Sequence, residues 1–286
     1  MVIVFRKIGI VQRGVDNPVP LTLFLCAFLG VFIALQRGGI IVDKIARVSI
    51  TTIITIFLAH HLSMLLHEWT HSTIAWIYGY KASPFDIYYG DWTLLSAWEL
   101  IDYKSILAEG KGKIVSIIAI SPIILGGILY LLGVMLLSKR QIKNNKILWY
   151  FLFWFTLSNL GQVLDYIPIR TFTAYHDGLL RGDIGHFIQG LNLSPWIVFI
   201  PGTLFVVMGV WEVLKFEVSR AYVVMGVSDL RTRKRLLFLV LAYLFFWYGS
   251  SGFHVSFISD VFSCISILAV PVLFYYYNPA REGLEK

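Results

Sequence analysis

Residues 48–79 read VSITTIITIFLAHHLSMLLHEWTHSTIAWIYG, and this long apolar run decides the fold class. About 20 apolar residues suffice for a helix to cross a bilayer, so the run predicts one long or tilted crossing. Working outward from it, runs of similar or slightly shorter length occur at about 20–36, 114–138, 147–168, 195–214, 235–250 and 254–277. We therefore predict an all-α, multi-pass helical bundle of six or seven spans, and we expect it in the cell membrane.

The composition excludes a disordered chain and an ordinary soluble enzyme. Of 286 residues, 57% are hydrophobic and 14% are charged, and the mean hydropathy is +0.73; soluble domains have roughly 25% charged residues. The formal net charge is +7, carried by short basic runs between apolar stretches, such as residues 139–143. This pattern favours contact with a lipid bilayer over nucleic acid. Cys26 and Cys264 lie inside apolar runs, and we expect both to be buried free thiols.

The longest segment between spans is 80–113, and it is rich in aromatic residues. Its runs 85–89 and 92–95 flank Gly90-Asp91, a pattern typical of a β-hairpin. An aromatic loop at the membrane interface would have a similar composition. We predict a small membrane-associated hairpin over 85–95.

The second span contains His67-Glu68-Trp69-Thr70-His71, a complete H-E-x-x-H motif. On a helix the two histidines lie one turn apart on one face, which suits a zinc ion, and the glutamate can take a proton from water. Ionisable residues inside an apolar helix are costly and mark functional sites. We predict that His67 and His71 bind Zn²⁺ and that Glu68 is catalytic. His60 and His61, two turns upstream, are expected to line a polar cavity.

A catalytic zinc site needs a third protein ligand. The metzincin pattern is excluded because Ile74 and Ile77 stand where it requires a glycine and a third histidine. Glu99 is one candidate, although no helical pattern supports it. The region 165–186 is the better one, because it follows a span with polar residues and because Pro168 should break that helix.

Together these motifs resemble the site-2 protease family of intramembrane zinc metalloproteases. In that family, H-E-x-x-H is followed by a membrane-associated β segment, a span beginning near Gly-Pro, an N-x-x-P helix break and a D-G-G-H or D-G-G-R motif. The matching positions are Ser121-Pro122, Asp165-Tyr166-Ile167-Pro168 and Asp183-Ile184-Gly185-His186. The resemblance covers about 60–195 and implies Asp183 as the third zinc ligand.

The chain departs from the family pattern in two places. Asp165 replaces the family's asparagine, so Asn159 is a possible substrate or oxyanion contact. The interval from Pro168 to Asp183 is longer than usual, and Asp177-Gly178 within it offers Asp177 as an alternative third ligand. We favour Asp183, because the glycine, the histidine and a following helix fit it.

The resemblance implies a zinc-dependent endopeptidase that hydrolyses transmembrane proteins or membrane-proximal peptides, with the hairpin holding the substrate extended. It divides the chain into an N-terminal segment and first span (1–47), a metalloprotease core (48–194) and C-terminal accessory spans (195–286). Three alternatives remain. They are a non-proteolytic zinc-binding homologue acting as a regulator or accessory subunit, an H-E-x-x-H membrane protease with Glu99 as ligand, and a histidine-box di-iron oxidase.

The sequence gives conflicting indications of membrane orientation. The loop 139–146 has four basic residues and no acid, and the segment 215–235 has six basic residues. Positively charged loops favour the cytoplasm, which would place the predicted hairpin outside. The family resemblance implies the opposite, with the zinc site nearer the cytoplasm, so the orientation stays open at this point.

Overall fold

The computed structural model describes residues 44–90, 97–173, 175–176 and 179–280. This part of the chain is mostly helical and has almost no strand, as predicted. In chain order it contains α2 (Lys44–Ile77), α3 (Tyr103–Ala108), α4 (Gly112–Leu137), α5 (Arg140–Asn144), α6 (Lys146–Leu164), η1 (Asp165–Ile169), β1 (Tyr175–His176), β2 (Leu179–Leu180), α7 (Gly182–Leu191), α8 (Trp196–Glu212), η2 (Val213–Glu217), α9 (Val218–Val224), α10 (Leu230–Leu241), η3 (Ala242–Tyr248) and α11 (Phe257–Tyr276).

Five helical segments among the described residues are long and apolar enough to span a membrane: Ser49–Ile77, Gly112–Leu137, Lys146–Ile169, Trp196–Val224 and Phe257–Tyr276. The all-α class is therefore confirmed, and the length and composition of these helices suit a membrane protein. The predicted count of six or seven spans stays a prediction, because only the described residues can be compared with it. The run 20–36 lies outside the described residues. The run 235–250 covers the second half of α10 and η3. The first turns of α10 carry four basic residues.

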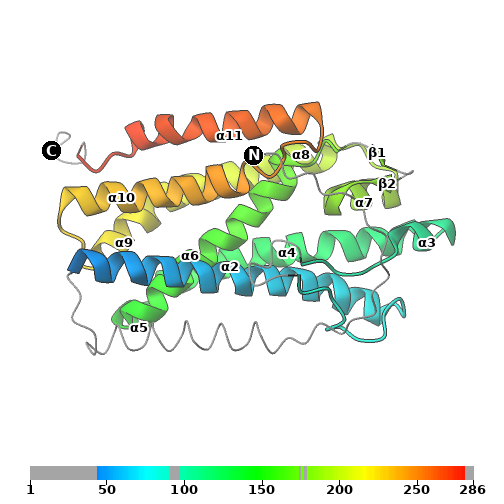
Figure 1. Ribbon diagram of the computed structural model, residues 1–286, viewed down its shortest axis with the longest axis horizontal. Helices are drawn as coiled ribbons and strands as arrows, with labels where there is room; N and C mark the ends of the chain where they lie inside the picture. The colour runs from blue at the N-terminus through cyan, green and yellow to red at the C-terminus, as the bar shows by residue number, and fades with distance from the viewer. Residues whose placement is uncertain (1–43, 91–96, 174, 177–178, 281–286) are drawn as a thin grey trace.

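The core of the bundle is formed by α2, α4 and α6, which pack on one another, with α6 crossing the other two (Figure 1). The most buried of the three is α6, whose aromatic residues Trp149, Phe153 and Trp154 are fully enclosed. The exposed large apolar side chains of α8 and α11 are suited to contact with lipid. Cys264 belongs to this outward-facing set, so the expectation that it is buried is wrong, although it is a free thiol. Cys26 lies outside the described residues.

Close backbone contact places α7 against the start of α4. A Cβ atom on Gly112 would lie 2.3 Å from the carbonyl oxygen of Gly190, so only a glycine fits there without displacement. The Ser116 hydroxyl also donates to the Phe187 carbonyl over 2.8 Å. These contacts fix the short helix that the sequence predicted after Asp183.

The helix break at Pro168 is confirmed, and it takes the form of a π-helical turn. The last turn of the α6 segment widens into η1, which contains Pro168, and the chain leaves the helix at Arg170. Between this break and α7 lies the predicted insertion, which forms a two-residue antiparallel ladder pairing Tyr175 with Leu180 and His176 with Leu179. The insertion thus carries the chain from η1 to the N-terminus of α7.

In the segment predicted to form a hairpin, the described residues show a single antiparallel bridge. Tyr88 and Trp98 exchange backbone hydrogen bonds of 2.9 and 3.0 Å. Residues 91–96, where the turn would be, lie outside the described part of the chain. The hairpin therefore stays a prediction.

The two ends of the bundle differ in their charge. The basic loop containing α5 lies at the same end as the turn from α9 to α10, whereas α3, α7 and the β1–β2 ladder lie at the other end (Figure 1). At the end that carries the basic loop, Arg220 on α9 donates a hydrogen bond of 3.1 Å to Ser138, the residue that follows α4.

Candidate metal centre

His67 and His71 lie one turn apart on α2, and the Nε2 atoms of both face the carboxylate of Asp183. The distances from the two Nε2 atoms to Asp183 Oδ2 are 3.0 and 3.2 Å. All three residues are buried, and their potential ligand atoms lie within 4.8 Å of one another. The structure thus brings together the two motif histidines and the aspartate that the resemblance implied.

Asp183 reaches the histidines because of the backbone around it. Gly182 has a φ of +73°, a left-handed conformation that favours glycine, and Asp183 follows in the first turn of α7. A carboxylate in that position is favoured by the helix dipole. The alternative ligand Asp177 lies outside the described residues.

The spacing of the three donor atoms fits a tetrahedral metal site. Ligand bonds of about 2.0–2.1 Å at tetrahedral angles separate neighbouring donor atoms by roughly 3.3 Å. The observed separations of 3.0 and 3.2 Å are close to that value. A metal ion would therefore require only a small expansion of the group.

Each histidine is also held by a contact outside the group. His71 Nδ1 lies 2.9 Å from the carbonyl oxygen of Ile118 on α4. A proton on Nδ1 leaves Nε2 free to bind metal, which is the usual arrangement of a ligating histidine. The His67 ring stacks on the Tyr166 ring of η1, with centroids 5.0 Å apart and an interplanar angle of 12°. The guanidinium of Arg170 also lies over the Tyr166 ring, 4.9 Å from its centroid.

Glu68 is buried beside the metal group, and its carboxyl group lies close to that of Glu99. Glu99 is held in place by the Lys81 ammonium group, which donates to the backbone carbonyls of Asp86 and Glu99. Glu99 was one candidate for the third metal ligand at the sequence level. In the structure its carboxyl group contacts Glu68 and Tyr103, and the group that could hold a metal contains Asp183.

Burial and neighbouring charges shift the pKa values of residues around the centre. Burial alone would raise the pKa of Asp183, but the imidazoles of His71 and His67 outweigh it and hold that pKa below its usual range. Burial, reinforced by the nearby carboxylate of Glu99, raises the pKa of the Tyr103 hydroxyl. Burial lowers the pKa of His186, whose ring packs on Tyr103. The site therefore favours an ionised Asp183 beside neutral Tyr103 and His186.

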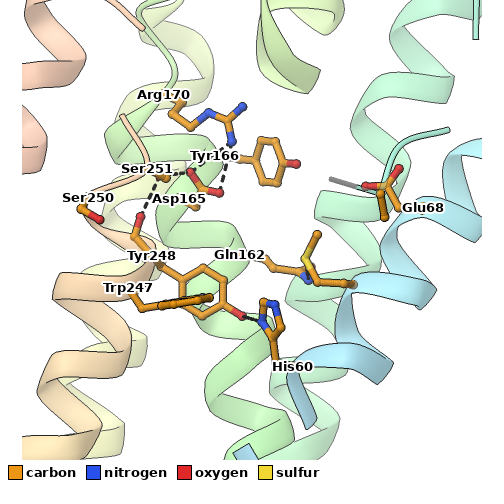
Figure 2. A pocket seen from close by; sticks show the side chains of 12 residues that line it. His60, Glu68, Gln162, Asp165, Tyr166, Arg170, Trp247, Tyr248, Ser250 and Ser251 are labelled. Atoms are coloured by element: carbon orange, nitrogen blue, oxygen red, sulfur yellow. Dashed lines mark hydrogen bonds and ion pairs between the residues drawn. The ribbon is translucent and has the colours of Figure 1, made fainter. Parts of the chain in front are cut away.

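The other predicted residues lie outside the metal group. Asn159 is buried, and its side-chain amide donates to the Phe155 carbonyl over 2.7 Å. The ring of His61 packs on Phe57, whose carbonyl oxygen lies 2.8 Å from His61 Nδ1. His60 does line a polar cavity, as predicted, and Glu68 and Gln162 line it too (Figure 2).

Comparison with known proteins gives no relative: no family model, no curated protein and no solved structure matches this chain. What the site can do therefore has to be argued from its own geometry.

Proposed function

We propose that this chain is a multi-pass, zinc-dependent intramembrane endopeptidase of the site-2 protease type, located in the cell membrane. The observation that carries the proposal is the buried group of His67, His71 and Asp183, with Glu68 beside it on the same helix. A hydrolytic site of this class consists of a metal group with one carboxylic acid placed to move a proton.

Zinc is the metal that we infer from the donor set. Two imidazole nitrogens and one carboxylate oxygen are typical of a catalytic zinc site, which leaves the fourth position open. Bound zinc would supply Lewis-acid polarisation of a peptide carbonyl and a lowered pKa for water.

Glu68 would carry the proton in the reaction. Its carboxylate would take a proton from the attacking water and give it to the leaving amine. Glu99, whose carboxyl group lies close to that of Glu68, would provide a second carboxyl group that can share this proton. Tyr103, whose hydroxyl lies 3.5 Å from His71 Nδ1, and Tyr166 would exclude water from the far sides of the two histidines.

The substrate we infer is a transmembrane protein or a membrane-proximal peptide. The two histidines of the metal group lie on Ser49–Ile77, one of the segments apolar enough to span a membrane, so a peptide bond must reach membrane depth to be cleaved. A helical substrate hides its carbonyl groups in hydrogen bonds and would have to unwind. The segment around the Tyr88–Trp98 bridge would hold it extended by strand addition.

The test is a comparison of the purified wild type with Glu68→Gln and Asp183→Ala. We expect one zinc per chain in the wild type and in Glu68→Gln, and less than a tenth of that in Asp183→Ala. Asp229→Ala, which changes an aspartate at the N-terminus of α10, should keep its zinc and serves as the matched control.

Cleavage is then measured on single-pass model substrates in lipid vesicles. Wild type should cleave them, and Glu68→Gln should not. Zinc in the wild type without cleavage of any substrate would favour the non-proteolytic zinc-binding homologue. Cleavage that persists in Glu68→Gln would contradict the proposed role of Glu68, and iron in place of zinc would favour an oxidase.

A further inference from the structure

The cavity beside the metal centre has a wall that the proposed catalytic chemistry does not use. It measures about 470 Å³ and lies between α2, the end of α6 with η1, and the C-terminal segment formed by η3 and the turn after it. Figure 2 shows Glu68 on one side of this cavity and Trp247 with Ser250 on the opposite side. The C-terminal segment is thus brought within one cavity of the proposed catalytic residue.

The volume suits a ligand better than the single water molecule that hydrolysis needs. One water molecule occupies about 30 Å³ in the liquid, whereas ligand pockets range from roughly 300 to 1,000 Å³. Apolar and polar side chains both line the walls, among them Met64, Trp247 and Gln162. Such a lining accommodates part of a peptide chain.

One ring nitrogen of His60 has no hydrogen-bond partner among the residues that the structure describes. The side chain is buried, and its Nδ1 lies 3.3 Å from the Tyr248 hydroxyl (Figure 2). Its Nε2 is also buried and has no partner within the described part of the chain. Buried polar atoms are seldom left unpaired in proteins, so this nitrogen indicates a ligand that hydrogen-bonds inside the cavity.

A chain of hydroxyl groups fixes the orientation of the His60 ring. The Tyr248 hydroxyl lies 3.4 Å from that of Tyr243, which lies 2.8 Å from the Ser158 hydroxyl. Because Ser158 donates to the Trp154 carbonyl, it can only accept from Tyr243. The proton of Tyr248 can point to either neighbour, so His60 Nε2 can act as a donor or as an acceptor.

Apart from the proposed catalytic Glu68, which follows His60 by about two turns of α2, the charged side chains that line the cavity are paired with each other. Arg170 lies 3.2 Å from the Asp165 carboxylate, and Ser251 donates to the same carboxylate (Figure 2). A charged side chain beside His60 would lose its hydration without gaining a free counter-ion. The cavity therefore favours an uncharged ligand.

Distances along α2 locate the ligand atom relative to the metal centre. His60 precedes His67 by seven residues, which at 1.5 Å per residue is about 10 Å along the helix axis. An extended peptide advances by about 3.4 Å per residue. A side chain that reaches His60 would then belong to a residue about three positions from the bond at the metal centre.

We propose that this cavity is a specificity pocket for a polar, uncharged substrate side chain such as glutamine or serine, about three residues from the cleaved bond, and that His60 Nε2 recognises it. Identifying the ligand as part of a peptide rests on the proposed endopeptidase function. His60 is then a specificity-determining residue. The C-terminal segment acts through Tyr248, which orients the His60 ring.

The experiment measures peptide binding directly, in the full-length Glu68→Gln protein, so that no peptide is cleaved. The probes are fluorescently labelled ten-residue peptides of Ala, Val and Leu in detergent micelles, with one position changed in turn to Gln, Ser, Glu or Lys. Empty micelles correct for partitioning of the peptides. At one position we expect Gln to bind about fivefold more tightly than Leu, which is what one net hydrogen bond gives, and we expect Glu and Lys to bind more weakly than Gln.

Three substitutions in the same background assign the preference to His60. His60→Phe should bring the Gln-to-Leu ratio to one, and His60→Gln should retain part of it. His61→Phe is the matched control, because it makes the same change at the next residue of α2, whose ring packs on Phe57, and it should leave the ratio unchanged. Equal thermal melting of the variants shows that they are folded.

The outcomes separate this inference from the proposed function. A ratio lost in His60→Phe alone supports the pocket, even if the wild type cleaves nothing. Three results would overturn it: equal binding of Gln and Leu peptides, a preference that survives His60→Phe, or no binding beyond that of empty micelles. The cavity would then be filled by water alone. Cleavage of the peptides by the wild-type protein tests only the endopeptidase proposal.

Discussion

The Nδ1 atom of His71 lies 2.9 Å from the carbonyl oxygen of Ile118, a group that a regular α-helix would use internally. The partner of that carbonyl would be the backbone N–H of residue 122, four positions later. Residue 122 is a proline inside α4 and has no N–H. The carbonyl is therefore free to accept from His71, and the Ser121 hydroxyl also donates to it over 2.8 Å.

Replacing Pro122 with alanine should consequently weaken metal binding while it stabilises the helix. The new N–H would compete with His71 for the Ile118 carbonyl, and loss of such an outer contact lowers metal affinity by about tenfold. Zinc affinity can be measured by competition with a fluorescent chelator, and helix stability by thermal melting. Pro271→Ala, a proline inside α11, should raise the melting temperature without changing zinc affinity. Unchanged affinity in Pro122→Ala would show that His71 does not need this carbonyl.

The Tyr166 ring, which stacks on His67 and lies beneath Arg170, should orient the His67 imidazole. Tyr166→Ala removes an aromatic contact worth roughly 0.5–1.5 kcal/mol, so we expect zinc affinity to fall between about twofold and tenfold. Tyr166→Phe keeps the ring and should bind zinc like the wild type. Tyr222→Ala is the control, since Tyr222 also lies beneath an arginine, Arg233, but on α9. Equal loss of zinc in both alanine variants would indicate general destabilisation.

Part of this site could be predicted from the sequence, because part of it is local. His67, Glu68 and His71 follow one another on one helix, and their spacing alone places them on one face. Asp183 required the family resemblance, because its place beside α2 depends on the packing of α7 against α4, as between Gly190 and Gly112. For that reason Asp177 remained an alternative at the sequence level.

The missed features are those created by contacts between distant segments. No periodic pattern in 80–102 showed that Lys81 would hold Glu99 against Glu68. The stack on Tyr166 and the C-terminal wall of the cavity likewise depend on how α6 ends and how η3 packs. One signal was available: the proline four residues after Ile118 could have identified a free carbonyl, although not the histidine that uses it.

Lys81 should hold the segment that carries Glu99 in its folded position. Its side chain is almost completely buried, and its ammonium group joins the carbonyls of Asp86 and Glu99. Lys81→Met keeps the apolar stem and removes both hydrogen bonds, at a cost of about 2 kcal/mol. We expect residues 85–99 to become at least tenfold more sensitive to limited proteolysis, with zinc content unchanged. Lys104→Met, at an exposed position on α3, should have no effect, and equal proteolysis in both variants would contradict the role of Lys81.

The metal centre should face away from the cytoplasm, because it lies at the end of the bundle opposite the basic loops. The loop around α5 carries four basic residues and the first turns of α10 carry four more, and these two regions lie at one end of the bundle, whereas α3 and α7 lie at the other end (Figure 1). Positively charged loops favour the cytoplasmic side. In a background with Cys26→Ser and Cys264→Ser, we expect a membrane-impermeant maleimide to label Lys104→Cys in intact cells and Asn144→Cys only after lysis. The opposite pattern would place the metal centre on the cytoplasmic side, as the family resemblance implies, and would show that loop charge does not set the orientation of this chain.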